Sequence, residues 1–306
     1  MEKKKYGLLY YVKFTWKQFS NDNGFMMAAA LSYYTLFSVG PLLIVIIALL
    51  GFVIESTDLE NVLFEQLGGV MGYTQANELK GVVQNAKNSS SETLATIISS
   101  FTLLITSTAV VIHLKETLNK AWNVIKDPSL GFKAVVVDRI MSLGFLLGLG
   151  FIFLVSMGLN TVATLLSNQV ASIIPEIGET TVFITSTTIG LVVTFIMFYL
   201  LFRFLPDARL QSRDLIVGAV VTTIMFAIGR YAISYYLGYS DISSTFGSAG
   251  ALASFMVWVY YNAIILIIGA EFTQVYALAH GRNVYPSDQS LKVERVIIKQ
   301  SDDSDV

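Results

Sequence analysis

Six long stretches of this chain are almost free of charged residues, and they limit the folds that it can adopt. About 20 apolar residues in a helix cross the ~30 Å hydrocarbon core of a membrane. Only helices and closed barrels satisfy their backbone hydrogen bonds in lipid, and these stretches lack the alternating polarity of barrel strands. The sequence therefore predicts an all-α polytopic membrane protein, a bundle of six transmembrane helices within 25–280, with spans at about 25–54, 93–113, 138–160, 180–203, 214–237 and 242–278.

The composition supports a membrane protein and argues against several other classes. Of 306 residues, 54% are hydrophobic and 14% are charged, whereas soluble domains carry about 25% charged residues. The chain has no cysteine and two histidines, and it lacks the metalloprotease, nucleophile-elbow and phosphate-loop motifs. Its basic residues are dispersed at helix ends rather than gathered into a patch for nucleic acid. We therefore expect no enzyme activity, no cofactor, no metal and no nucleic-acid partner.

The distribution of lysine and arginine predicts the orientation. Seventeen of them flank one side of the predicted spans and two flank the other, with Arg230 inside a span set aside. Basic residues mark cytoplasmic loops, so both termini are expected in the cytoplasm. Residues 6–20, within a cytoplasmic segment 1–24, mix aromatics with lysines and predict an amphipathic helix along the membrane interface. The polar residues 281–306 are expected to form a disordered cytoplasmic tail.

Arg230 is the only charge that interrupts the apolar run from Leu215 to about Leu237 in the fifth predicted span. It lies 15 residues beyond Leu215, roughly 22 Å into the core at 1.5 Å per residue. Its long side chain can snorkel to the outer headgroups, or it can turn into the bundle and meet polar groups or an anionic ligand. Pro41 in the first span leaves the carbonyl of Phe37 without its helical donor. We predict the inward orientation, toward Phe37 and Ser38.

The first and sixth spans supply further candidates for a solute pathway. The first half of span one, "AAALSYYTLFSVGP", is rich in hydroxyl groups, which suits the lining of a cavity, although tilt and ordinary helix packing explain it equally well. The candidate pathway or substrate-binding residues are Arg230, Tyr33, Tyr34, Ser38, Pro41 and Asn262.

Glu271 follows a long uncharged run near the cytoplasmic boundary. An acid at that depth is expected to pair with Arg139 or Arg203, and the alternative is a carboxylate that couples transport to a proton or ion. Gly144 and Gly148 form a GxxxG pattern, which predicts close approach of another helix to the third span.

Four segments carry a family resemblance: "AAALSYYTLFSVGPLLIVIIALLG" (28–51), "LKETLNKAWNV" (114–124), "LFRFLPDARLQSRDLIVGAVVTTIMFAIGR" (201–230) and "FGSAGALASFMVWVYYNAIILIIGAEF" (246–272). Together they resemble the YihY/BrkB family of six-helix inner-membrane proteins, formerly mislabelled ribonuclease BN. The resemblance implies the bacterial cytoplasmic membrane and a role in envelope biology, and it brings no catalytic residues.

Three functions follow from the sequence and the resemblance. The first is a transporter or exporter of a lipid precursor or a small anionic solute. The alternative is a non-transporting membrane scaffold or assembly factor, and the second alternative is a membrane-embedded enzyme. Membrane lipids are expected partners in every case. The sequence leaves open whether the chain forms a homo-oligomer.

Overall fold

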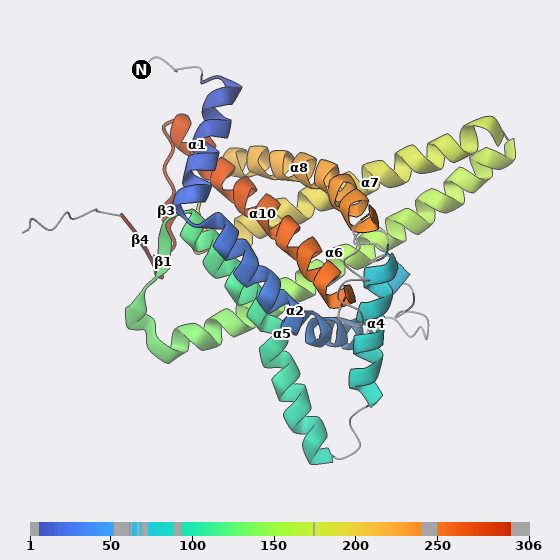
Figure 1. Cartoon of the computed structure of the whole chain (residues 1–306), viewed down its shortest axis with the longest axis horizontal. Coiled ribbons are helices and arrows are strands. Elements are labelled where there is room, and N and C mark those ends of the chain that lie inside the picture. Colours follow the sequence, from blue (N-terminus) through green and yellow to red (C-terminus); the bar gives the residue numbers. More distant parts are fainter. Residues whose placement is uncertain are drawn as a thin grey trace, which may run out of the picture.

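The computed structural model describes residues 6–51, 61, 63–65, 68, 73–88, 93–173, 175–239 and 250–294. It confirms an all-α membrane protein built from long helices (Figure 1). Five helices in the described part are long and apolar enough to cross a membrane. They are α2 (Gly24–Gly51), α6 (Gly131–Ile173), α7 (Pro175–Phe204), α8 (Ser212–Tyr239) and α10 (Gly250–Ala279).

Three further long helices belong to the described part. They are α1 (Leu8–Asn21), α4 (Tyr73–Asn88) and α5 (Thr93–Ala121). The second predicted span lies in α5, a helix of 29 residues that is not among the five. Each of the six predicted spans thus falls within one long helix wherever the structure describes it. The α6 and α7 helices, with 43 and 30 residues, extend well beyond their predicted spans.

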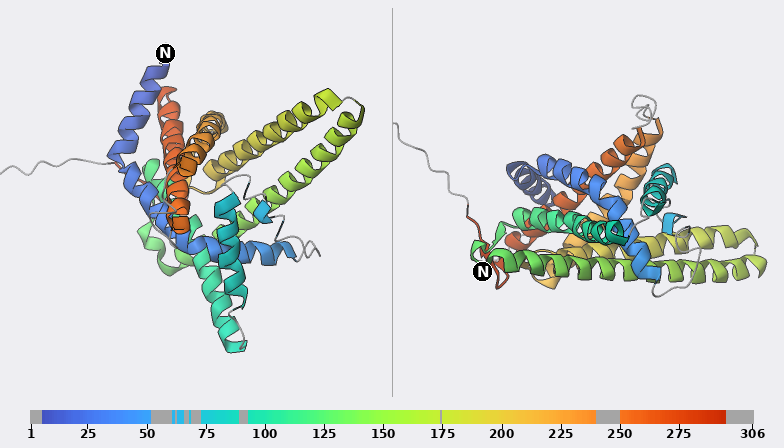
Figure 2. Two further views of the ribbon diagram at one scale, coloured as in Figure 1. Left: turned by 45° about the vertical axis from the view of Figure 1, so that its right-hand side comes forward. Right: turned by 90° about the horizontal axis from the view of Figure 1, so that it is seen from below.

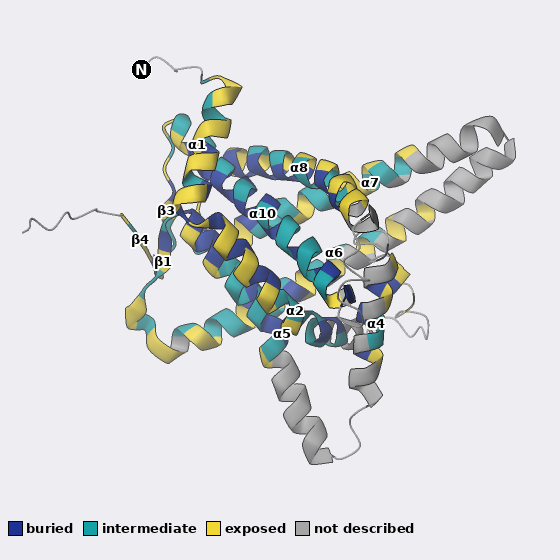
Figure 3. Ribbon diagram, in the orientation of Figure 1, coloured by how far each residue is buried: buried dark blue, intermediate teal, exposed yellow. Residues whose placement is uncertain are grey.

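Helix α10 lies at the centre of the bundle. It packs against α1, α2 and α8, so that α2 and α8 lie on different sides of it, and α5 packs beside α2. The antiparallel pair α6 and α7 contacts the bundle mainly through α8 and α5 and extends away from it (Figures 1 and 2). Burial follows this arrangement. In the apolar segment of α10 44% is buried, whereas in that of α7 only 6% is buried (Figure 3). Apolar side chains on the outer helices therefore face outward, as lipid contact requires.

Helix α1 joins the bundle through one face. Phe19 and Thr15 are buried, and the Tyr11 ring lies 5.9 Å from that of Phe272 on α10. On the opposite face Leu8, Leu9, Val12 and Trp16 are exposed beside lysines. A helix with an uncovered apolar face and basic residues suits a membrane interface, and that location stays a prediction.

Helices α8 and α10 approach each other closely at two glycines. A Cβ on Gly218 would lie 1.9 Å from Thr273 Oγ1, and a Cβ on Gly269 would lie 2.0 Å from Thr222 Oγ1. Each threonine hydroxyl donates to the glycine carbonyl of its own helix, at 2.7 Å. The two helices thus present the same glycine–threonine pair to each other, and the absence of a Cβ allows their backbones to approach closely.

The GxxxG prediction for α6 is wrong within the described chain. No atom of a neighbouring residue lies within 4 Å of a Cβ built on Gly144 or Gly148, and both glycines are exposed. The physical reason is that α6 turns this surface outward, so its small residues contact no other described helix.

The expectation that residues 281–306 are disordered is wrong for the part of this segment that the structure describes. Strand β3 (Tyr285–Pro286) pairs with β2 (Ala208–Arg209), and β4 (Ser290–Lys292) pairs with β1 (Val124–Lys126), both antiparallel. These backbone hydrogen bonds attach the segment to the α5–α6 and α7–α8 connections. Both lie at the basic end, which is the end of the bundle that carries most of the lysines and arginines. The pairing explains why the segment is ordered. Residues 295–306 lie outside the described part.

Candidate functional site

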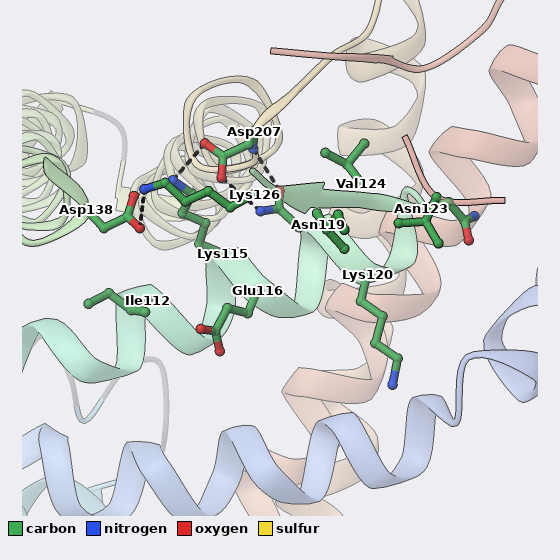
Figure 4. Close-up of a pocket in the computed structure, with 12 residues that line it drawn as sticks. Ile112, Lys115, Glu116, Asn119, Lys120, Asn123, Val124, Lys126, Asp138 and Asp207 are labelled. Atoms are coloured by element: carbon green, nitrogen blue, oxygen red, sulfur yellow. Dashed lines mark hydrogen bonds and ion pairs between the residues drawn. The ribbon is translucent and has the colours of Figure 1, made fainter. Parts of the chain in front are cut away.

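A pocket of about 380 Å³ opens at the basic end of the bundle, where the connections between helices meet (Figure 4). The last three turns of α5 and strand β1 form most of it. Asp138 of α6, Asp207 of the α7–α8 connection and Val293 of the C-terminal segment complete the wall. The pocket therefore joins residues that are distant in the sequence.

The end of α5 is fixed by its last residues. Trp122 is buried, and its indole Nε1 donates to the carbonyl of Ala270 at 3.0 Å, which ties α5 to α10. Asn123 has φ 55°, a left-handed conformation that asparagine tolerates and that turns the chain out of the helix. Its carbonyl then accepts from Val293 N at 2.8 Å. Strand β1 and the C-terminal segment are thereby set beside each other at the pocket wall.

Lys115 lies between two aspartates. Its Nζ is 2.7 Å from Asp138 Oδ1 and 2.7 Å from Asp207 Oδ1. Lys126 reaches the other oxygen of Asp138, with Nζ 2.6 Å from Oδ2, and it also donates to the Ala134 carbonyl at 2.9 Å. Figure 4 shows the four side chains converging from different elements. Ion pairs thus connect α5, β1, α6 and the α7–α8 connection.

Asn119 holds Asp207 in place. Its Nδ2 donates to Asp207 Oδ2 at 3.0 Å, while its Oδ1 accepts from the Asp207 backbone N at 2.7 Å. Both carboxylate oxygens of Asp207 are therefore engaged, one by the amide and one by Lys115. This reciprocal contact holds both the carboxylate of Asp207 and the backbone of the α7–α8 connection.

The network is largely shielded from solvent. The side chains of Lys115 and Asp138 are 13% and 17% exposed, so their mutual attraction is screened less than that of a surface pair. Burial opposes the charged form of Lys115, but hydrogen bonds and charge from Asp138 and Asp207 outweigh it and raise its pKa. Lys115 consequently keeps its charge through the physiological pH range.

A second ion pair lies nearby and serves the fold rather than the pocket. Arg282, just after α10, donates through Nε to Asp214 Oδ2 at 2.9 Å and through Nη2 to Oδ1. Asp214 is fully buried in the first turn of α8, where the helix dipole also favours a carboxylate. The bidentate pair closes the end of α10 onto the beginning of α8.

Arg230 lies in α8 and is half-buried. Its described contact is with the Tyr231 ring, 5.3 Å from the guanidinium carbon. Phe37 is exposed on α2, Ser38 is buried there, and α10 packs against both α2 and α8. No hydrogen bond or ion pair of Arg230 with Phe37 or Ser38 is among the described contacts, and the inward orientation of Arg230 stays a prediction.

The other pathway candidates are also dispersed. Tyr33 is exposed, Tyr34 stacks on His113 with ring centroids 3.4 Å apart, and Asn262 Nδ2 donates to the Trp258 carbonyl of its own helix at 2.7 Å. Pro41 lies inside α2, which continues past it as a helix. Among the described residues these side chains do not line the pocket of Figure 4.

Glu271 is fully buried in α10. It directly follows Ala270, whose carbonyl accepts the hydrogen bond from the Trp122 indole. The two arginines proposed as its partners have described hydrogen bonds elsewhere. Arg139 donates to the Ile105 carbonyl and to Thr108, and Arg203 donates to the Leu210 carbonyl at 3.3 Å. The pairing of Glu271 with either arginine stays a prediction.

Sequence reasoning missed the charged residues of the pocket, because they flank predicted spans where contact with lipid headgroups explains basic residues. One signal was present. Asp138 lies between Lys133 and Arg139, and Asp207 lies between Arg203 and Arg209; an acid among basic residues near the membrane suggests an internal partner.

Comparison with known proteins places these features in a wider group. The family model described as virulence factor BrkB matches residues 15–292. Similar curated proteins are UPF0761 membrane proteins from Psychrobacter sp. (24% identical over 90% of this chain and 50% of that protein) and Psychromonas ingrahamii (24%, 86% and 86%). A third, from Chromohalobacter salexigens, is 25% identical over 83% of this chain and 60% of that protein. The chain thus spans about half the length of the first relative. No solved structure matches.

Proposed function

Since the chain belongs to the BrkB family of membrane proteins, we propose that it transports a lipid precursor or a small anionic solute across the bacterial cytoplasmic membrane. In this proposal both termini lie in the cytoplasm, and the pocket at the basic end is the cytoplasmic gate. The proposal extends to a role in the cell envelope, because an exported lipid precursor would be used there.

One observation carries the proposal: Lys115 and its two aspartates join two long helices and the connection between two others at one end of the bundle. Lys115 belongs to α5, Asp138 to α6, and Asp207 to the connection between α7 and α8. Ion pairs between rigid elements are suited to switching, since exchanging one partner releases a helix without unfolding it. An anionic solute that enters the pocket competes for the same lysines and thereby couples its own binding to movement of α6 and α7.

The scaffold alternative is favoured by a different observation. At the basic end, Trp122, Leu118, Phe202 and Leu215 belong to one buried apolar cluster that joins α5, α7 and α8. A tightly filled end of this kind suits a protein that holds a partner in a fixed position. The two functions differ in whether the ion pairs must open.

The experiment compares a deletion strain with strains that express the wild type, Asp207→Asn or Asp288→Asn at equal protein levels. Phospholipids and lipid precursors are quantified and assigned to membrane leaflets by reagents that do not cross the bilayer. Asp207→Asn weakens the gate and should alter the distribution, whereas Asp288, in an exposed pair with Arg209, should leave it at the wild-type value. A distribution that is identical in the deletion and wild-type strains, with small anionic solutes also unchanged, would refute transport.

A further inference from the structure

Asp138 is bound by the two lysines in a specific way. Each of its oxygens receives one ammonium group, Oδ1 from Lys115 at 2.7 Å and Oδ2 from Lys126 at 2.6 Å. Two donors that converge on separate oxygens of one carboxylate form the arrangement with which proteins bind an external oxyanion. The carboxylate comes from α6, whereas both lysines come from α5 and the strand that follows it.

We propose that Lys115 and Lys126 form a binding site for the phosphate group of a ligand, and that Asp138 occupies this site as an internal stand-in. The inference rests on the proposed function in one respect, since the ligand would be the transported species. The phosphate belongs either to a lipid headgroup or to a small soluble molecule, and both present the same oxygens to the two lysines.

The charges of the pocket favour an anionic ligand once Asp138 leaves. Lys120 also lines the pocket, is exposed, and has no ion pair within the described residues. Glu116, the remaining acid of the wall, lies 3.1 Å from His113 Nδ1. When Asp138 leaves, the lining keeps three lysines and two acids, Asp207 and Glu116, an excess of one positive charge. A phosphate monoester carries about −1.5 to −2 at neutral pH and three acceptor oxygens, so it can accept from Lys115 and Lys126 together.

The two lysines are held by backbone that does not depend on Asp138. Lys126 belongs to β1, which pairs with β4 in the register Lys126–Ser290, and Asp127 N donates to the Gln289 carbonyl at 3.0 Å. Lys115 keeps its contact with Asp207, which Asn119 holds on two sides. The site therefore stays assembled when α6 withdraws its carboxylate, and the pocket of about 380 Å³ has room for a phosphate group.

Binding at this site consequently opposes the contact of α6 with α5. A phosphate group bound to Lys115 and Lys126 displaces Asp138 from both lysines. The displaced carboxylate then needs water or another polar partner. The energetic link between ligand and helix movement is thus the exchange of one anion for another on the same two ammonium groups.

The test measures phosphate binding by the detergent-solubilised full chain with two probes, inorganic phosphate and dihexanoyl phosphatidic acid. Asp138→Asn removes the competing charge and should lower the Kd for at least one probe by about tenfold or more. Adding Lys126→Gln to that variant should cancel the gain. Asp288→Asn, which removes an acid from an exposed pair, should leave both Kd values unchanged.

The two probes distinguish the sources of the phosphate. Tighter binding of phosphatidic acid alone assigns the site to a lipid headgroup, and tighter binding of both probes assigns it to the phosphate group itself. A folded Asp138→Asn protein, judged by gel filtration and circular dichroism, that binds neither probe more tightly than the wild type overturns the inference.

A second variant covers the case in which Asp138→Asn fails to fold. Lys126→Gln alone should raise the Kd of the otherwise unchanged chain by about tenfold for the probe that binds, and an unchanged Kd overturns the site. Failure of the transport experiment leaves these Kd values unaffected, so the two proposals can fail separately.

Discussion

Replacing Gly269 by alanine should destabilise the protein, because this glycine lies against Thr222 where α8 and α10 approach each other closely. The added Cβ would be 2.0 Å from Thr222 Oγ1 and 3.0 Å from Thr222 Cβ, whereas carbon atoms in contact prefer about 3.5–4.0 Å. Either α10 moves outward, or Thr222 rotates and loses its 2.7 Å hydrogen bond to the Gly218 carbonyl.

The magnitude follows from three opposing terms. Overpacking costs about 1–3 kcal/mol, and a lost hydrogen bond costs about 1 kcal/mol. Alanine returns up to about 1 kcal/mol through its higher helix propensity. The free energy of unfolding should therefore fall by about 2 kcal/mol in Gly269→Ala, and the double variant Gly269→Ala/Thr222→Ala should recover most of this loss, because the shorter side chain relieves the contact.

Unfolding in mixed micelles by added dodecyl sulfate, followed by tryptophan fluorescence, provides the measurement. Gly148→Ala is the matched control, since it makes the same change in a membrane helix where no neighbouring atom lies within 4 Å of the new Cβ. It should not lower stability, and higher helix propensity should raise it by up to about 1 kcal/mol. Equal effects of Gly269→Ala and Gly148→Ala would refute the assignment of the close contact to α8 and α10.

Three further predictions concern charges and topology. Arg282→Met should lower the free energy of unfolding by about 3 kcal/mol, because it leaves the buried Asp214 without its bidentate partner. The control is Arg209→Met, which breaks a pair whose side chains are 63% and 85% exposed and should change the free energy by less than about 1 kcal/mol. Equal losses in the two variants would contradict this prediction. The raised pKa of Lys115 means that its contribution to stability is complete below its unfolded pKa and is lost only as the pH rises through the folded value. Lys115→Met should therefore be equally destabilising at pH 6 and pH 9 in the same titration, and an effect that disappears by pH 9 would show that the charge is not held. Cysteines placed at Gly72 and Asp288, in a chain that has no other cysteine, should react with an impermeant thiol reagent from opposite sides of the membrane, and labelling from the same side would refute the six-span topology.

The expected pathway residues illustrate where sequence reasoning ended. Depth along a span was derivable for Arg230 and Phe37 from the rise per residue, but depth alone does not determine which helices are neighbours. Helix α10 packs between α2 and α8, so two residues at similar height belong to surfaces that face different neighbours. Likewise, GxxxG identified small residues on α6, whereas the shared pattern "GAVVT" (218–222) and "GAEFT" (269–273) was the signal for the contact that forms.

The sequence by itself determined the class of the fold and the position of its long helices, because a backbone in lipid must satisfy its own hydrogen bonds and this requirement acts on each segment separately. It also located the excess of basic residues at one end. Only the tertiary structure decided that Lys115 meets Asp138 and Asp207 and that residues 285–286 and 290–292 form strands. The physical reason is that helices that are apolar on all sides do not reveal in their sequence which face turns toward which neighbour. Pairings between segments distant in the chain depend on that rotation.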